Sequence, residues 1–310
     1  MKKAKILVVG SLNMDITATT NIFPNEGETV FGNCLTSAAG GKGLNQACQL
    51  GLLNADVKML GAVGNDGNGQ ALLATLNKMG VDCQDIVIKN DVASGAAIIL
   101  LEMDDEGNGA NRIIVIPGAN TAFNYHDIKV IEDIIKEYDM VVLQLEVAME
   151  VNEKVAALAR ANGVKVMLNP APYAPLSKEL LANIDYLSPN EHELKAMTGV
   201  EVCDNGIFFE ERLKTAYESL KGLGLKALLV TMGDVGSAFT DGEKIHYVPS
   251  IKTIAIDTTA AGDSFVSSFC LKIAEDESVL QAMEFATKVA SYTVSHKGAS
   301  SSLPKIEDIV

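Results

Sequence analysis

The sequence predicts an α/β fold in which a mostly parallel sheet is covered by helices on both faces. Short runs rich in β-branched residues alternate with helix-like patterns along most of the chain, and this alternation is typical of parallel sheets built from strand–helix–strand units. The expected core strands are Lys5 to Val9, Val57 to Val63, Met140 to Leu145, Val164 to Leu168, Tyr186 to Ser188 and Ala227 to Thr231.

Two apolar stripes near the end of the chain predict a pair of adjacent amphipathic helices. In both stripes the apolar side chains recur every three or four residues, which places them on one helical face. The first stripe contains Phe265, Val266, Phe269, Cys270 and Ile273, and the second contains Val279, Met283, Ala286, Ala290 and Thr293.

Two regions predict strands without intervening helices. They run from about residue 28 to 37 and from about 94 to 116, and the second has a turn signal at residues 104–109. We expect them to form a small antiparallel sheet that serves as a lid over the main sheet. Because no linker or internal repeat separates the regions, residues 1–310 are expected to form a single domain that includes this lid.

Composition and charge restrict the class of protein. The chain has 310 residues with a formal net charge of −15, so nucleic acid and anionic membranes are not expected as partners. No apolar run is long enough to cross a bilayer, and the basic start of the chain leads into a strand rather than a signal peptide. The five cysteines form neither a disulfide nor a zinc pattern, which favours a reducing compartment.

The strongest local signal for chemistry is the segment Asp257–Asp263. Small residues, Ala260, Ala261 and Gly262, precede the carboxylate of Asp263 where the first of the two late helices begins. The N–H groups of such a turn can hold a phosphate, and Asp263 can then take a proton from an attacking alcohol. In isolation, an interaction of Asp263 with its own helix dipole is the better explanation of the segment.

A glycine-rich turn, Gly40–Ala47, leads into the first helix. It lacks the spacing of a Walker A loop, so a P-loop fold is excluded. Its glycines allow the backbone, Lys42 and Asn45 to approach a polyhydroxylated ligand closely. An ordinary helix start with a glycine turn is the alternative for this segment.

Polar side chains also follow several predicted strands, at the edge where ligands bind in parallel sheets. Asn13 and Asp15 follow the first strand, and Glu146 follows the strand that begins at Met140. These groups can bind sugar hydroxyls, although polar turns and a solvated acid are the simpler explanations. Thr231, Gly233 and Gly236 end another strand and are candidates for a nucleotide site.

Asn190 and Glu193 lie three residues apart where a strand leads into a helix. This spacing suits a hydrated Mg²⁺ that is carried by substrate phosphates. The same spacing is typical of a helix cap, and the two roles are compatible.

Together these motifs resemble those of the ribokinase-like (PfkB) carbohydrate kinases over nearly the whole chain. Gly40–Ala47 resembles the N-terminal signature of that family and Asp257–Asp263 resembles its C-terminal signature. Three shorter motifs recur at similar spacing, namely 169–172, 188–191 and 297–299. The resemblance implies a Rossmann-like domain with a β-lid, ATP as co-substrate, and a homodimer formed through the lid. A cytoplasmic location is expected from the cysteine pattern and from the lack of an export signal.

The resemblance also implies roles for individual residues. Asp263 is then the catalytic base, and the backbone of Ala260, Ala261 and Gly262 forms the anion hole. The implied sugar contacts are Asn13, Asp15, Gly41, Lys42, Asn45, Glu146 and Asp263. The implied nucleotide contacts are Asn190, Thr231, Gly233 and Thr287, beside the candidate Gly236, and Asn190 and Glu193 organise Mg²⁺ through water.

Ribokinase-like enzymes carry an activating monovalent cation, usually K⁺, beside the anion hole. By similarity its oxygen ligands come from Asp257, Thr259, Thr293, His296, Gly298 and Ser302. In the family pattern a proline usually comes shortly after the Gly-Ala pair, but this chain has Ser300–Ser302 there. It also has Thr287 and His296 at positions where other residues are more usual.

The expected reaction is transfer of the γ-phosphoryl group of ATP to O5 of ribose, with Asp263 as general base. Within the family, deoxyribose, a hexose, a sugar phosphate or a nucleoside are alternative acceptors. An NAD(P)-linked oxidoreductase is a second class, but no G-x-G-x-x-G follows the first strand. The third class is a non-catalytic sugar-binding regulator.

Overall fold

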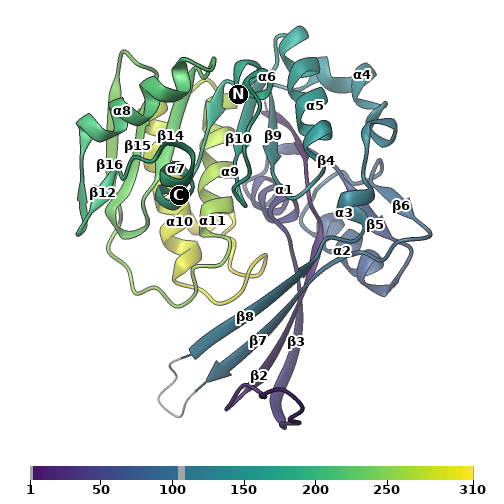
Figure 1. The fold of residues 1–310 in the computed structure, drawn as a ribbon. Helices are drawn as coiled ribbons and strands as arrows, with labels where there is room; N and C mark the ends of the chain where they lie inside the picture. Colours follow the sequence, from purple (N-terminus) through teal and green to yellow (C-terminus); the bar gives the residue numbers. More distant parts are fainter. Residues whose placement is uncertain (1–2, 104–108, 310) are drawn as a thin grey trace.

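A large, mostly parallel sheet forms the centre of the molecule in the computed structural model, which describes residues 3–103 and 109–309 (Figure 1). Within these residues eight strands pair in the order β16-β15-β14-β11-β10-β9-β1-β4. All pairs from β14 to β4 are parallel, and β15 and β16 are antiparallel. The strands are β1 (Lys5–Val9), β4 (Asp56–Leu60), β9 (Met140–Gln144), β10 (Lys165–Asn169), β11 (Tyr186–Leu187), β14 (Ala227–Thr231), β15 (Gly236–Thr240) and β16 (Ile245–Pro249).

Helices cover both faces of this sheet, as the sequence predicts. Successive residues of β1 point to opposite faces, so Ile6 and Val8 belong to one apolar cluster and Leu7 and Val9 to the other. The first cluster includes α1 (Lys42–Leu52), α2 (Gly67–Lys78), α9 (Ala261–Ala274) and α10 (Val279–Val294), and the second includes α5 (Met149–Ala161), α6 (Lys178–Asn183), α7 (Glu191–Thr198) and α8 (Glu210–Lys221).

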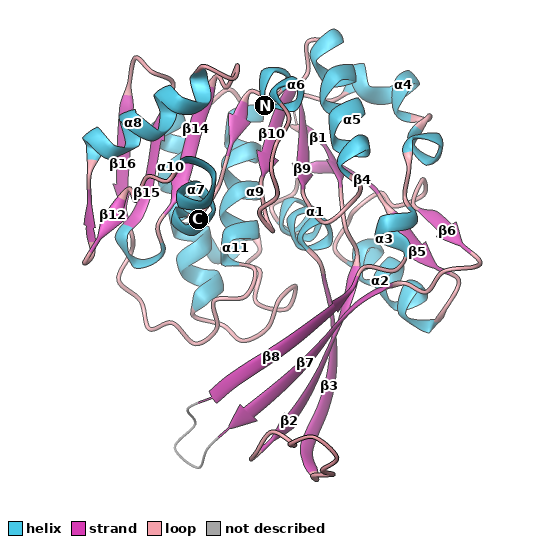
Figure 2. Ribbon diagram, in the orientation of Figure 1, coloured by secondary structure: helices cyan, strands magenta, loops and turns pink. Residues whose placement is uncertain are grey.

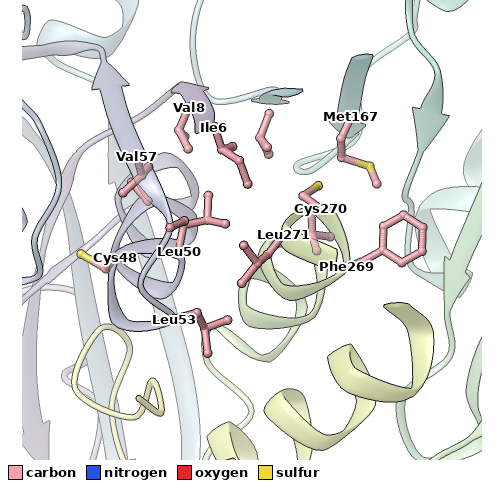
Figure 3. Close-up of a cluster of buried hydrophobic side chains, with 14 of the residues drawn as sticks. Ile6, Val8, Cys48, Leu50, Leu53, Val57, Met167, Phe269, Cys270 and Leu271 are labelled. Atoms are coloured by element: carbon pink, nitrogen blue, oxygen red, sulfur yellow. The ribbon is translucent and has the colours of Figure 1, made fainter. Parts of the chain in front are cut away.

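Helices α1 and α9 lie side by side on one face of the sheet, against β9, β1 and β4. Figure 3 shows Leu50 of α1 and Leu271 of α9 gathered with Ile6 and Val8 of β1 in one buried cluster. Burying a leucine or isoleucine side chain stabilises the fold by about 1.5–3 kcal/mol. This packing fixes the relative position of the N-terminal ends of the two helices, where both sequence signatures lie.

One predicted core strand is divided in the structure. The run Val57–Val63 was expected to be continuous, but it breaks at Gly61 into β4 and β5 (Ala62–Gly64), and β5 pairs with β6 (Val87–Lys89) in a separate sheet. A Cβ at Gly61 would lie 2.6 Å from the carbonyl oxygen of Gly10, so the close approach of the two chains at this break requires glycine.

The remaining elements are short. They are α3 (Ala119–Ala122), α4 (Ile131–Ile134), α11 (Ile306–Ile309), the 3₁₀ helices η1 (Tyr125–Ile128), η2 (Ile135–Glu137) and η3 (Gly233–Val235), and the hairpin β12 (Cys203–Asp204) and β13 (Ile207–Phe208). No helix in the described part of the chain combines the length and the apolar character needed to span a bilayer.

A second sheet, the lid, extends away from this body (Figure 2). Its order is β3-β2-β7-β8, formed by β2 (Asn13–Thr20), β3 (Gly32–Gly40), β7 (Gly95–Met103) and β8 (Gly109–Ile116). The two predicted regions supply three of these strands, and β2 was not predicted. The expected antiparallel arrangement holds for the outer pairs, whereas the central pair β2–β7 is parallel. Most of the predicted turn at 104–109 lies outside the described residues.

The lid joins the body close to the end of β1. Strand β2 begins at Asn13, four residues after β1 ends at Val9. The side chain of Asn120 fixes this junction, because its Oδ1 accepts a hydrogen bond from the Leu12 N–H (2.9 Å) and its Nδ2 donates to the Leu12 carbonyl (3.1 Å) and to Asn13 Oδ1 (2.8 Å). The first residues of β2 are therefore held where lid and body meet.

Candidate active site

The N-terminus of α9 is an open turn with unpaired donors. Ala260, the residue before the helix, adopts a left-handed conformation with φ of 60°. The Ala261 N–H bonds the Thr258 carbonyl at 3.3 Å, whereas the N–H groups of Gly262 and Asp263 have no hydrogen-bond acceptor within the described residues. A Cβ added at Gly262 would meet no atom within 4 Å. The turn therefore presents N–H groups and open space to an anion.

Asp263 lies in the first turn of α9 and is 7% exposed. Its two carboxylate oxygens accept hydrogen bonds from α1, from Asn45 Nδ2 at 2.9 Å and from Gln46 Nε2 at 3.1 Å. Burial raises the pKa of Asp263, against the opposing effects of the Lys42 ammonium and of these two amides. A carboxyl group with a raised pKa, held beside open space, has the character of a general base.

Lys42 is the first residue of α1 and lines the same cavity as Asp263. Burial lowers the pKa of its ammonium group, but the carboxylates of Asp263, Glu146 and Glu193 outweigh burial, and the pKa is raised. The side chain therefore stays protonated at neutral pH. It supplies a positive charge among the acidic groups of the cavity.

Glu146 lies at the N-terminus of α1. Its Oε2 accepts hydrogen bonds from the Lys42 N–H (3.0 Å) and from Ser11 Oγ (2.5 Å). A carboxylate in this position is stabilised by the positive end of the helix dipole. Gly41 precedes α1 with φ of 90°, and a Cβ there would lie 2.8 Å from the Asn13 nitrogen. The close approach of the signature turn to the start of β2 therefore requires glycine at this position.

Asn13 and Asp15 follow the first strand, as expected, and they belong to the start of lid strand β2. Asn13 is 5% exposed, and its Oδ1 accepts the hydrogen bond from Asn120. Burial, together with repulsion from Glu146 and Asp263, raises the pKa of Asp15 from 3.8 to about 6. The electrostatic coupling shows that three carboxyl groups share one region at the base of the lid.

Asn190 and Glu193 form the capping box of α7. The Glu193 N–H donates to Asn190 Oδ1 at 2.8 Å, and the Asn190 N–H donates to Glu193 Oε2 at 2.8 Å. Both residues also line the cavity next to Lys42 and Asp263. Burial raises the pKa of Glu193, opposed by the Asn190 N–H and by Lys42. The predicted cap exists, and it leaves both side chains at the edge of the cavity.

The cavity has a volume of about 200 Å³ and lies at the carboxyl edge of the main sheet. It brings together parts of both signatures, the ends of β10 and β14, and residues that follow β10 and β11, although these segments are far apart in the sequence. Its lining residues are Lys42, Asn169, Ala171, Ser188, Asn190, Glu193, Thr231, Thr258, Ala260, Gly262, Asp263 and Val266.

Three of the expected nucleotide residues lie outside this lining. Gly233 begins η3, and Gly236 begins β15, where a Cβ would lie 2.2 Å from the Val248 carbonyl oxygen. Gly236 is therefore needed for pairing with β16, whatever else it does. Thr287 is buried on α10, and its hydroxyl donates to the Met283 carbonyl at 2.8 Å. Of the three candidates at the end of β14, which are Thr231, Gly233 and Gly236, only Thr231 lines the cavity.

The expected cation residues lie on two loops and, for Thr293, in the last turn of α10, and Asp257 holds the two loops together. Its carboxylate accepts hydrogen bonds from the N–H groups of Thr259 and Gly298, each 2.9 Å long. Burial alone would raise the pKa of Asp257, but these hydrogen bonds outweigh burial and the pKa is lowered. The carboxylate therefore stays ionised between the two loops.

Two hydroxyls of this set, one at the end of α10 and one in the loop after it, already donate hydrogen bonds. Thr293 Oγ1 donates to the Val289 carbonyl at 3.0 Å, and Ser302 Oγ donates to the Ala299 carbonyl at 2.8 Å. The His296 ring stacks on Tyr292 with 4.1 Å between centroids. Each hydroxyl oxygen keeps a lone pair while it donates, so hydroxyl and carbonyl oxygens both remain as ligands of the kind that a hard cation such as K⁺ accepts.

Several polar residues of the site were not assigned from the sequence. Ser11, Gln46, Gln144 and Asn169 contact Glu146, Asp263 or each other. Gln46 and Gln144 stand in segments that the sequence marks, the glycine-rich motif and the strand end before Glu146. Neither shows a charge or a metal-ligand spacing, so no signal separated them from packed polar side chains.

The fold and the site define a phosphotransferase acting on a small alcohol. A helix N-terminus with free N–H groups lies beside a buried carboxylate and a lysine, and the lid joins the body at the same edge of the sheet. Comparison with known proteins makes the class specific. The chain belongs to the pfkB family of carbohydrate kinases, and the profile of that family matches residues 3–306. The predicted enzyme class, a sugar kinase, is confirmed.

Individual relatives match over nearly their whole length. A ribokinase of Lactococcus lactis subsp. lactis is 36% identical over 306 residues, covering 98% of this chain and 95% of the relative. A deoxyribokinase of Salmonella typhi is 33% identical over 303 residues, covering 97% and 96%. The solved structure of the Arabidopsis thaliana ribokinase with ribose and ATP has a TM-score of 0.92 and 32% identity, covering 99% of this chain and 98% of that one.

Proposed function

We propose that this kinase transfers the γ-phosphoryl group of ATP to O5 of ribose, with Asp263 as the general base. The observation that carries the proposal is the position of the Asp263 carboxylate, buried in the first turn of α9 next to the unpaired N–H groups of that turn. A hydroxyl beside Asp263 loses its proton as it attacks the γ-phosphorus. The N–H groups of the 260–263 turn then stabilise the negative charge that develops on the phosphoryl oxygens.

The sugar site is assigned to the base of the lid and the start of α1. Carboxylates accept hydrogen bonds from sugar hydroxyls, and Lys42 donates to sugar oxygens. Asn45 also offers an acceptor, because its buried Oδ1 has no partner in the described structure. The proposed sugar contacts are Asn13, Asp15, Gly41, Lys42, Asn45, Glu146 and Asp263.

The nucleotide site is assigned to the other side of the α9 turn. The backbone of Ala260, Ala261 and Gly262 holds the γ-phosphate as the anion hole. Asn190 and Thr231, which line the cavity, support this assignment. The proposed nucleotide contacts are Asn190, Thr231, Gly233, Gly236 and Thr287.

Two cations complete the proposal. Mg²⁺, which offsets phosphate charge when it is bound, is held by Asn190 and Glu193 through water; their place at the cavity edge supports this. K⁺ is assigned to oxygens of Asp257, Thr259, Thr293, His296, Gly298 and Ser302. The residues fit in kind, since both loops carry oxygen donors and an ionised Asp257 joins them.

A coupled assay of ATP consumption with ribose, with and without K⁺, tests the proposal. We expect ribose-dependent turnover that K⁺ increases and that Asp263→Asn lowers by about 10²–10⁴-fold. Asp91→Asn, on the surface, is the matched control and should behave as wild type. A folded Asp263→Asn protein with wild-type turnover would remove Asp263 from its proposed role.

Deoxyribose is the second candidate acceptor. Its support is the deoxyribokinase relative, whose identity to this chain is within a few per cent of that of the ribokinase relative. The ratio of kcat/KM for ribose and 2-deoxyribose separates the candidates. A ratio below one would show that the enzyme prefers the sugar without the 2-hydroxyl, and 2-deoxyribose would then replace ribose as the proposed acceptor.

The proposal extends to assembly and location. We infer one domain over residues 1–310 with its lid and a homodimer formed through the lid, because the lid exposes large apolar side chains. These include Phe31, Leu35, Ile113, Ile114 and Val115. We also infer a cytoplasmic location, supported by the five cysteines, all of which lie among the described residues and none of which is in a disulfide.

A further inference from the structure

Gln46 connects Asp263 to a second buried glutamine. Its Nε2 donates to Asp263 Oδ1 at 3.1 Å and lies 3.3 Å from Asn169 Oδ1, while its Oε1 accepts a hydrogen bond of 2.7 Å from Gln144 Nε2. Gln46 and Gln144 are both fully buried. Neither lines the cavity, and their contacts with residues that do line it are those of Gln46 with Asp263 and Asn169.

The charge of Asp263 fixes the direction of this chain of amides. An ionised carboxylate only accepts hydrogen bonds, so Gln46 must turn its NH₂ toward Asp263 and its oxygen toward Gln144. Gln144 must then present its own NH₂ to that oxygen. The remaining oxygen, Gln144 Oε1, is buried and has no hydrogen-bond partner among the described residues. The unpaired acceptor therefore belongs to Gln144, the amide that does not contact Asp263.

The structure holds Gln144 tightly in this arrangement. Asn152 Nδ2 donates to the Gln144 backbone carbonyl at 2.7 Å. A Cβ at Gly10 would lie 1.8 Å from Gln144 Oε1, so the side chain occupies space that only glycine leaves free. The amide of Gln144 is thus anchored in the sheet, while that of Gln46 bridges from the sheet to α9.

We propose that Gln46 and Gln144 form an amide relay that positions the Asp263 carboxylate for proton transfer. The inference deepens the proposed function and rests on Asp263 being its general base. Both glutamines are positioning residues, because neither lines the cavity and they reach the proposed proton acceptor through the hydrogen bond from Gln46 to Asp263. Gln46 holds one carboxylate oxygen, and Gln144 keeps Gln46 in the orientation in which it donates.

The relay acts on Asp263 alongside several charged groups. The hydrogen bond from Gln46 opposes the rise that burial causes in the pKa of Asp263. Loss of the Gln46 donor is therefore expected to raise that pKa further. The other charged groups coupled to Asp263 come from α1, β2, the loop after β9, and α7, and they are Lys42, Asp15, Glu146 and Glu193.

Methionine substitutions test the relay, because methionine matches the length of glutamine and cannot make these hydrogen bonds. We expect Gln46→Met to lower kcat by about 10–100-fold, to move the acid limb of the kcat profile to higher pH, and to leave the sugar KM nearly unchanged. Gln144→Met should act in the same direction and less strongly. Gln49→Met is the control, since Gln49 is equally buried on α1 but donates to Pro304 O.

The double variant separates a relay from two independent packing roles. If Gln144 acts through Gln46, adding Gln144→Met to Gln46→Met changes kcat no further. Additive losses, or a pH profile that does not move, would overturn the relay. If Gln46→Met does not fold, Gln144→Met decides, because it leaves Gln46 in place: an unshifted acid limb in that variant counts against the proposal.

Asp263→Asn, measured in parallel, tells the two proposals apart. If Asp263→Asn is inactive while both methionine variants match wild type, the relay fails and the proposed function stands. If Asp263→Asn keeps wild-type turnover, the proposed role of Asp263 fails, and the relay fails with it.

Discussion

Asn45 Nδ2 donates a hydrogen bond of 2.9 Å to Asp263 Oδ2, although the two residues are 218 positions apart in the sequence. The contact joins the two signature segments, one at the start of α1 and the other at the start of α9. Both residues are more than nine-tenths buried, so the amide replaces water as the partner of the carboxylate. The geometry of the proposed base therefore depends on how these two helices pack.

Asn45→Asp should disable the site electrostatically. Two carboxyl groups would then lie in contact, which raises the pKa of the pair and favours a shared proton. We expect kcat/KM for ribose at pH 7 to fall by at least about tenfold and to recover partly as pH rises. A pH series of steady-state rates measures this effect, and Asn77→Asp on the surface of α2 is the control. Unchanged activity at pH 7 would argue against Asp263 as base.

Ala260→Gly should stabilise the protein without loss of activity. A left-handed conformation costs an alanine about 1–2 kcal/mol, partly offset by the greater flexibility of unfolded glycine. With φ of 60° at Ala260, we expect a gain of up to about 1 kcal/mol in urea unfolding.

Gly262→Ala tests the proposed position of the γ-phosphate. The site has open space for a methyl group, so stability should change little, but the methyl group would enter the cavity beside the proposed phosphate position. ATP turnover should then fall while the unfolding midpoint stays constant. Full activity in Gly262→Ala would place the γ-phosphate elsewhere.

Asp15→Asn should make the ligand-free protein more stable at neutral pH and weaken its sugar binding. The folded wild type keeps the Asp15 proton up to about pH 6, while the unfolded chain releases it near pH 4. Wild-type stability therefore falls as pH rises from about 4 to 6, and this loss amounts to at most about 3 kcal/mol. The variant does not lose stability in this way, so its free energy of unfolding should exceed that of the wild type by more at pH 8 than at pH 5.

Urea unfolding at pH 5 and pH 8 checks the stability effect, with Asp56→Asn on the surface as the control. Calorimetric titration with ribose checks the binding effect. An advantage that is the same at both pH values would show that Asp15 is not held protonated in the fold.

Substitutions at Glu193 separate the helix cap from the proposed metal role. Glu193→Gln retains an acceptor for the Asn190 N–H, so α7 should keep its stability, whereas loss of the charge should raise the Mg²⁺ concentration needed for half-maximal activity. Glu193→Ala removes the charge and also the acceptor for the Asn190 N–H, so it should also lower the free energy of unfolding by about 0.5–2 kcal/mol. If Glu193→Gln and the wild type depend equally on Mg²⁺, Glu193 has a role in capping α7 and none in binding the metal.

The exposed lid surface predicts an effect on assembly. Leu35 of β3 is 72% exposed, so Leu35→Glu removes little packing within the chain, but it would place a charge in a dimer interface. We expect sedimentation analysis to show a shift from dimer to monomer with an unchanged circular dichroism spectrum. Leu223→Glu on the body is the control, and a dimer that survives Leu35→Glu would exclude this part of the lid from the interface.

Elements of the body were easier to predict than those of the lid. The body strands are buried on both faces and appear as continuous apolar runs, so β1 and β14 match their predicted bounds. Strand β2 alternates polar and apolar residues directly after a polar turn and is only partly buried. Its pairing with β3 and β7 comes from partners distant in the sequence, which a local pattern does not record.

The sequence by itself determined the fold class, the two helix starts that carry the chemistry and the family of sugar kinases, because each rests on a short segment whose residue types have a direct physical meaning. Only the tertiary structure decided which polar groups meet. Asn45, Gln46 and Gln144 converge on Asp263 because α1, β9 and α9 pack against one another. Hydrogen bonds act over about 3 Å, and proximity of that kind arises only when distant segments are folded together.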